Sequence, residues 1–121
     1  MTVAYWVVAI LLAVFYLYAG GMKVVRSKEQ LLPMMAWVDT TPLALVRAIG
    51  IIEILGAIGL ILPPLTGVAP GLALAAAVGL VLVQIGAIAL HLRRGETKVL
   101  GLNIVLIALA AVATWLATVW I

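Results

Sequence analysis

The chain contains no cysteine among its 121 residues, and only 9% of its residues are charged. The absence of thiols excludes a thiol–disulfide mechanism, an iron–sulfur cluster and thiolate ligation of a metal. A soluble domain has about 25% charged residues, so this chain has too little polar surface to coat a water-soluble globule. With 68% hydrophobic residues and a mean hydropathy of +1.39, the composition indicates an integral membrane protein.

Metal-binding and catalytic groups are equally scarce. His91 is the only histidine, and Glu53 is the only acid inside an apolar run. No second histidine completes a metal site, and no nucleophile–base pair, phosphate loop or carboxylate pair is present. We therefore expect no metal site and assign no catalytic residue, and whether the protein is an enzyme stays open.

Four apolar runs are long enough to cross a bilayer as helices, at about 20 residues each. We expect these helices at about 3–22, 43–62, 68–90 and 100–120, as an all-α transmembrane four-helix bundle in one domain, 1–121. The runs are continuous rather than alternating, which excludes transmembrane strands. Each half of the chain has a helix, a basic connection and a second helix, so the bundle is interpreted as two tandem helical hairpins.

The three connections differ in composition, and the third, Arg93–Lys98, is basic. Pro63–Gly67 predicts a tight uncharged turn between the second and third helices. The connection from Lys23 to Pro42 has apolar residues between charged ones, which predicts a short interfacial helix or re-entrant segment.

All seven Lys and Arg residues lie in or beside the first and third connections, and neither the second turn nor either terminus has one. The positive-inside rule then places both basic connections in the cytoplasm and both termini outside. Basic residues that mark topology in this way are no signal of nucleic-acid binding, despite the net charge of +3.

Glu53 is the strongest functional candidate. A carboxylate in hydrocarbon costs roughly 2.5–3.5 kcal/mol even on lenient insertion scales, and Glu53 lies about 15 Å from the cytoplasmic end of its helix at 1.5 Å per residue. Gly50 and Gly56 share its side of the helix, which indicates a packed face. Gln84 of the third helix lies nearby in depth, so we expect a hydrogen bond or a water between them. Without a strong charged partner, Glu53 would be neutral and able to donate a hydrogen bond.

Further polar residues predict a funnel that narrows toward Glu53 and Gln84. Gln84 and His91 are seven residues apart, as are Tyr16 and Lys23, so each pair points the same way along its helix. The residues expected at the basic and polar mouth are Lys23, Arg47, His91, Arg93 and Asn103. The candidate ligand-binding residues are Glu53, Gln84, Arg47, His91, Lys23 and Tyr16.

Three stretches carry a resemblance to a known family: YAGGMK at 18–23, LVRAIGIIEILG at 45–56 and ALHLRRG at 89–95. With the four-helix layout, they make nearly the whole chain resemble the small DoxX-like membrane proteins. The resemblance implies a four-helix bundle, mostly bacterial and hence in the plasma membrane. It also marks four positions as candidates for functional residues, without assigning them catalytic roles: Lys23, Arg47, Glu53 and His91. The family is named after a subunit associated with an archaeal quinone-linked oxidase, and wider relatives include membrane chaperones and cargo receptors.

Two hypotheses follow. In the first, a small redox-associated protein binds a quinone-like or other lipophilic ligand at Glu53, with Gln84 orienting that group. Lys23, Arg47 and His91 then attract a polar head group. In the second, the protein is a non-enzymatic accessory subunit or chaperone, and Glu53 is a structural tie. The expected partners are the bilayer and either a redox enzyme subunit or a lipophilic small molecule, and a homo-oligomer stays open. A transporter would need a dimer, because four helices are few for a solute path.

Overall fold

The computed structural model describes all residues, 1–121, and is built from four long helices with short helical segments between them. The first three long helices are α1 (Thr2–Val25), α3 (Leu43–Thr66) and α4 (Leu72–Arg93). The fourth span combines η2 (Thr97–Val99), α5 (Leu100–Leu116) and η3 (Ala117–Trp120). Each span is 22 to 24 residues long and mostly apolar, or about 33–36 Å of helix, enough to cross the hydrocarbon core. The predicted all-α, four-span architecture is confirmed.

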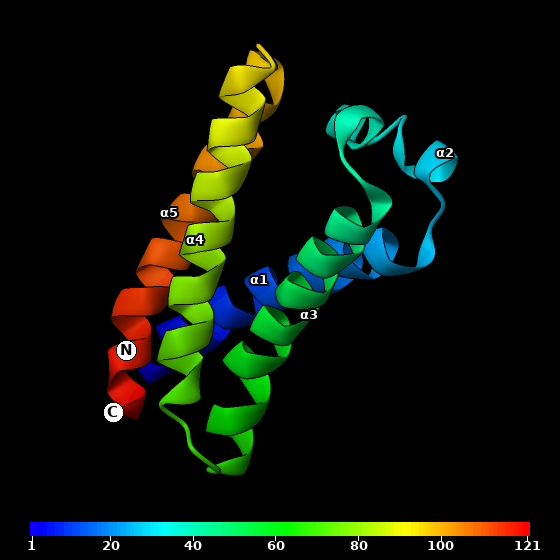
Figure 1. Ribbon diagram of the computed structural model, residues 1–121. Helices are drawn as coiled ribbons and strands as arrows, with labels where there is room; N and C mark the ends of the chain where they lie inside the picture. The colour runs from blue at the N-terminus through cyan, green and yellow to red at the C-terminus, as the bar shows by residue number, and fades with distance from the viewer.

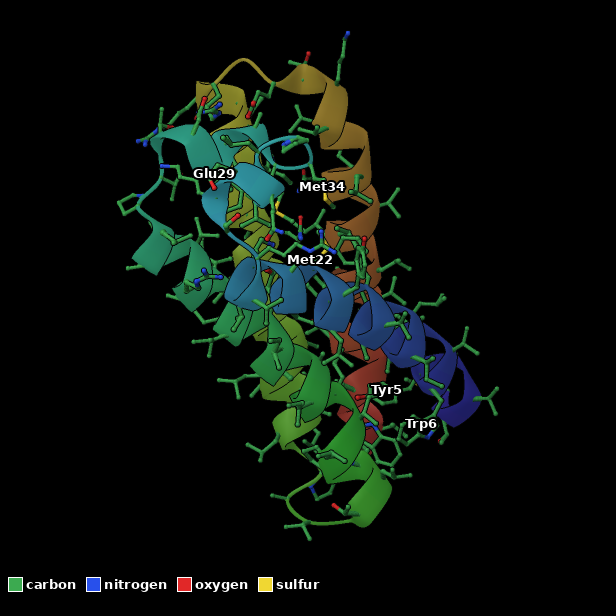
Figure 2. The ribbon with its side chains drawn as sticks, turned by 90° about the vertical axis from the view of Figure 1, so that its right-hand side faces the viewer. Tyr5, Trp6, Met22, Glu29 and Met34 are labelled. Atoms are coloured by element: carbon green, nitrogen blue, oxygen red, sulfur yellow. The ribbon has the colours of Figure 1, made fainter.

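The helices form two pairs, α1 with α3 and α4 with α5, as expected for two hairpins. Both termini lie at the same end of the molecule as the α3–α4 turn, and the pairs diverge toward the two basic connections at the other end (Figure 1). Tyr5 and Trp6 lie at the terminal end, and Glu29 and Met34 lie at the connection end (Figure 2). The pairs are therefore joined at one end and separated at the other.

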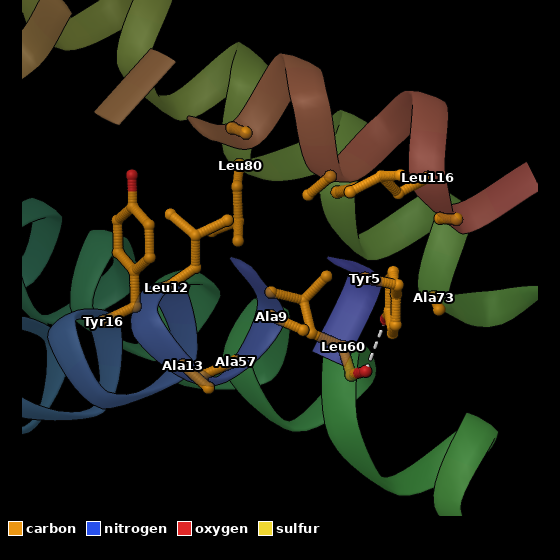
Figure 3. Close-up of a cluster of buried hydrophobic side chains, with 14 of the residues drawn as sticks. Tyr5, Ala9, Leu12, Ala13, Tyr16, Ala57, Leu60, Ala73, Leu80 and Leu116 are labelled. Atoms are coloured by element: carbon orange, nitrogen blue, oxygen red, sulfur yellow. Dashed lines mark hydrogen bonds between the residues drawn. The ribbon is translucent and has the colours of Figure 1, made fainter. Parts of the chain in front are cut away.

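The core that joins the two pairs is made largely of small residues. More than half of its 15 buried residues are alanines, and Leu and Tyr side chains fill the remaining space. Small residues let transmembrane helices approach closely, which is how such helices gain packing contacts in lipid. Tyr5 lies at one end of this cluster and Tyr16 at the other (Figure 3).

The predicted turn at Pro63–Gly67 is wrong, because α3 continues through both prolines to Thr66 and ends at Gly67, which has φ 74°. A proline has no N–H for the carbonyl four residues earlier, so Pro64 frees the carbonyl oxygen of Leu60. The Tyr5 hydroxyl donates to that oxygen at 2.5 Å (Figure 3). A partner from α1 thus satisfies the acceptor that the proline leaves. The true turn is 67–71, and α4 begins four residues later than expected.

The first connection contains the predicted short helix, α2 (Lys28–Leu31), followed by η1 (Ala36–Thr40). Ser27 and Gln30 form a capping box at the start of α2, with hydrogen bonds of 3.0 and 3.3 Å. Apolar side chains of the connection pack against the ends of α1 and α3 in a second buried cluster, made of Met22, Leu31, Trp37, Val38 and Val46. The connection is therefore folded against the bundle.

Candidate functional site

The site begins with a backbone contact between α1 and α3. A Cβ atom at Gly20 would lie 2.7 Å from the carbonyl oxygen of Gly50, and one at Gly50 would lie 2.7 Å from that of Gly20. Lys23 and Glu53 follow these glycines by three residues, so each lies on the face of its helix that makes the contact. The approach of the two helices therefore brings these two side chains together.

Glu53 has a charged partner, contrary to the sequence expectation. The Lys23 ammonium donates to Glu53 Oε1 at 2.5 Å, and the two side chains are only 10% and 4% exposed. Side chains of a helix lean toward its N-terminus, which on α1 is the direction of the bilayer centre. The four-carbon stem of Lys23 thus carries its charge from the helix end to the depth of Glu53.

Gln84 bonds to two other residues, and the direct Glu53–Gln84 hydrogen bond expected from the sequence is absent. Gln84 Nε2 donates to the Tyr16 hydroxyl at 2.6 Å, and Asn103 Nδ2 donates to Gln84 Oε1 at 2.8 Å. These side chains come from α1, α4 and α5. The network therefore connects the two helix pairs beside the ion pair.

A cavity of about 660 Å³ lies between the two helix pairs, and the segment 33–37 covers it at the connection end. Its walls are mostly apolar. Apart from aromatic residues, the chain has four buried polar or charged side chains, and all four line this cavity: Lys23, Glu53, Gln84 and Asn103. Cavities of this size with a few convergent polar groups are typical of small-molecule sites.

The mouth of the cavity holds a hydrogen-bonded group built around Glu96. His91 Nδ1 lies 3.1 Å from Glu96 Oε1, and both residues line the cavity. Arg94 Nε donates to the same oxygen at 2.9 Å. The hydrogen bond from Arg94, with a further one from His91, lowers the pKa of the Glu96 carboxyl below its usual range. Glu96 is therefore held as a carboxylate at the entrance.

Arg94 also joins the two basic connections to each other. It donates to Asp39 Oδ1 at 2.9 Å, to Thr40 Oγ1 at 2.8 Å and to the Ala36 carbonyl at 3.2 Å. The hydrogen bond from Arg94 lowers the pKa of the exposed Asp39 carboxyl. From the sequence, Arg94 was interpreted only as a topology signal, and Asp39 and Glu96 were not predicted as its partners. The available signal was the presence of opposite charges in both connections.

Arg47 and Arg93, expected at the mouth, do not line the cavity. The Arg47 guanidinium donates to the carbonyl oxygens of Lys23 at 3.0 Å, Val24, and Arg26 at 2.9 Å. These carbonyls belong to the end of α1, where a helix leaves acceptors without intrahelical partners and carries partial negative charge. Arg47 therefore caps α1, and it fixes the helix that carries Lys23.

The polar groups at the inner end of the cavity retain capacity for a ligand. Lys23 uses one of its three N–H donors, and Glu53 Oε2 accepts no hydrogen bond from the chain. Asn103 donates one of its two amide N–H groups. The arrangement can thus donate to a carbonyl and accept from a hydroxyl at the same place.

Residues 7–113 match the DoxX-like family. This range includes Tyr16, Lys23, Glu53, Gln84 and Asn103, so the match covers the cavity and most of the four spans. No curated protein and no solved structure matches the chain.

Proposed function

We propose that this chain, which belongs to the DoxX-like family, binds a quinone-like or other lipophilic molecule beside Glu53, as a small redox-associated protein of the bacterial plasma membrane. The observation that carries the proposal is the gathering of Lys23, Glu53, Gln84 and Asn103, four buried non-aromatic polar side chains, on one cavity. A buried polar group costs free energy unless it is hydrogen-bonded. Packing alone does not require polar side chains to gather around a space that is large enough for a ligand.

The site residues divide into two roles in this proposal. Lys23, Glu53 and Asn103 contact the polar head of the ligand, and Gln84 and Tyr16 hold Asn103 in place through their hydrogen bonds. The apolar wall, which includes Phe15 and Leu90 among others, contacts the remainder of the molecule. Under the positive-inside orientation the mouth at His91 faces the cytoplasm.

A short-tailed quinone analogue tests this proposal in detergent. A ligand that binds only the folded state raises its stability by about 2.7 kcal/mol at a concentration 100 times Kd, so we expect a higher melting temperature with the analogue. Gly86 lines the cavity and has open space where a Cβ would lie, so Gly86→Leu should fill the cavity and abolish the shift. Gly101 has the same open space but does not line the cavity, so Gly101→Leu should keep the shift. An equal shift in both variants would contradict the proposal.

The ion pair favours a second candidate function, that of a non-enzymatic accessory subunit or chaperone. Lys23 and Glu53 join α1 to α3 next to the glycine contact, as a structural tie would. In that case the cavity stays empty and the protein purifies with a larger membrane protein. Affinity purification from native membranes, followed by identification of any co-purified subunit, separates the two functions.

A further inference from the structure

We infer that the cavity selects lipophilic molecules whose head group carries no net charge, and that it rejects anionic amphiphiles such as fatty acids. The inference rests on the proposed function and names the class of ligand that the site takes. It follows from the charges that line the cavity and from the partners that each charge already has.

The inner end of the cavity is electrically balanced. Lys23 is the only Lys or Arg that lines it, and Glu53 neutralises this charge at 2.5 Å. Gln84 and Asn103 carry no charge. A carboxylate or phosphate head at this depth would therefore find no free cation, and it would approach the second oxygen of Glu53.

The mouth of the cavity also has no free lysine or arginine that could pair with an anionic head group. The ionisable residues that line it are His91 and Glu96. Arg94 bonds to Glu96, and it is also bonded to Asp39, so both of its ionic partners are acids. An anionic head is thus left without a counter-charge at either end, and a buried charge without a partner is strongly disfavoured.

A neutral head that forms hydrogen bonds meets no such cost. Lys23 has two N–H donors left and Asn103 has one, while Glu53 Oε2 accepts. A hydroxyl or carbonyl group satisfies these atoms without adding charge. The cavity therefore fits neutral amphiphiles such as quinones, quinols and long-chain alcohols.

Trp37 supplies a reporter, because it lines the cavity and is only 9% exposed. The probes are dibrominated octadecanol and dibrominated octadecanoate, which have the same chain and differ in head charge, at a pH that ionises the acid. Bromine quenches tryptophan fluorescence. The part of the quenching that the wild type shows and Trp37→Phe lacks measures occupancy of the cavity. Quenching of the three remaining tryptophans measures partition of each probe into the micelle.

We expect the alcohol to bind about tenfold or more tightly than the carboxylate, as the cost of a buried unpaired charge requires. Glu53→Gln frees the Lys23 charge and should reduce or reverse this preference. Glu29→Gln is the matched control, since Glu29 is exposed on α2 and does not line the cavity. It should behave as the wild type. The wild-type comparison stands by itself if Glu53→Gln does not fold.

The outcomes separate the inference from the proposed function. If both probes quench Trp37 equally, or the carboxylate binds more tightly in the wild type, the inference is overturned and binding in the cavity stands. If neither probe quenches Trp37, the inference and the proposed function both fail.

Discussion

Lys23 and Glu53 are coupled, so neither residue can be understood alone. Removing one partner of a buried ion pair leaves an uncompensated charge, which costs more than the intact pair contributes. The pair also explains how a charged lysine is only 8% exposed although it lies near the end of α1. The two charges are buried together, at 10% and 4% side-chain exposure.

Single substitutions should therefore be far more harmful than the double substitution. We expect Lys23→Met and Glu53→Leu each to destabilise the fold by about 3–5 kcal/mol. In the double variant no buried charge remains, so most of this stability should return. Unfolding in detergent, monitored by the circular dichroism signal of the helices, gives the free energy of unfolding of the three variants and of the wild type. Additive losses would show that the two side chains do not interact.

The depth of Glu53 and its packed face were predictable from sequence, but its partner was not. The apolar run places Glu53 near the bilayer centre, and Gly50 and Gly56 mark its side of the helix. Lys23 belongs to a different helix, and its reach depends on how α1 and α3 pack. The same reason explains Arg47: only the packed structure shows that its guanidinium meets the carbonyls at the end of α1.

At the scale of helices, the contact of Gly20 with Gly50 sets the distance between α1 and α3. A Cβ atom added to either glycine would lie only 2.7 Å from the carbonyl oxygen of the other. Backbone at that distance cannot move aside as a flexible side chain can. The ion pair of Lys23 and Glu53 therefore depends on two residues that have no side chain.

Gly50→Ala should push α1 and α3 apart, weaken the ion pair and lower the melting temperature. Gly21→Ala is the control, because a Cβ at Gly21 meets no atom within 4 Å. Alanine in a helix interior is favoured over glycine by roughly 0.5–1 kcal/mol, so this control should be neutral or slightly stabilising. Equal behaviour of the two variants in a thermal scan would argue against the close contact.

The bridge made by Arg94 should weaken in acid. Its partners Asp39 and Glu96 both have lowered pKa values in the folded protein. Lowered values stabilise the fold above the ordinary carboxyl pKa of about 4, and this stabilisation is lost as the pH falls through the folded values. We expect hydrogen exchange in 36–40 to rise as the pH falls below about 4, after correction for the intrinsic exchange rate.

The comparison variant for this bridge is Arg94→Gln, which should show fast exchange in 36–40 at all pH values. Arg93→Gln removes the same charge from an exposed neighbour and should retain the wild-type pH dependence. Slow exchange in Arg94→Gln at neutral pH would mean that the bridge does not hold the two connections together.

Hydropathy identified the four spans, but the limits of the helices depended on tertiary contacts. Two consecutive prolines usually indicate a turn, yet Pro63 and Pro64 lie inside α3, and Tyr5 satisfies the Leu60 carbonyl that Pro64 leaves free. The segment 33–37 shows the same limitation. Its composition predicts an interfacial position, and its packing over the cavity follows only from the assembled bundle.

At the scale of the whole molecule, both basic connections lie at one end and both termini at the other (Figure 1). In the orientation that the positive-inside rule predicts, the cavity would open toward the cytoplasmic leaflet. A ligand dissolved in that leaflet can then approach the mouth at His91 without crossing the bilayer.

The absence of cysteine makes this orientation simple to test. Lys98→Cys and Val68→Cys each place a single thiol at an exposed position, at opposite ends of the bundle. In intact cells, an impermeant maleimide should label the thiol at 68 and leave the one at 98 unlabelled. Labelling of 98 alone would reverse the orientation and place the mouth outside.

The measurement that tests the central claim most directly is native mass spectrometry of the protein extracted gently from its own membrane, with identification of anything bound. We predict one neutral lipophilic molecule per chain, such as a quinone or a long-chain alcohol, retained in Gly101→Leu and lost in Gly86→Leu. A chain that is always empty, or one that carries the same molecule in both variants, would contradict a ligand site in the cavity beside Glu53.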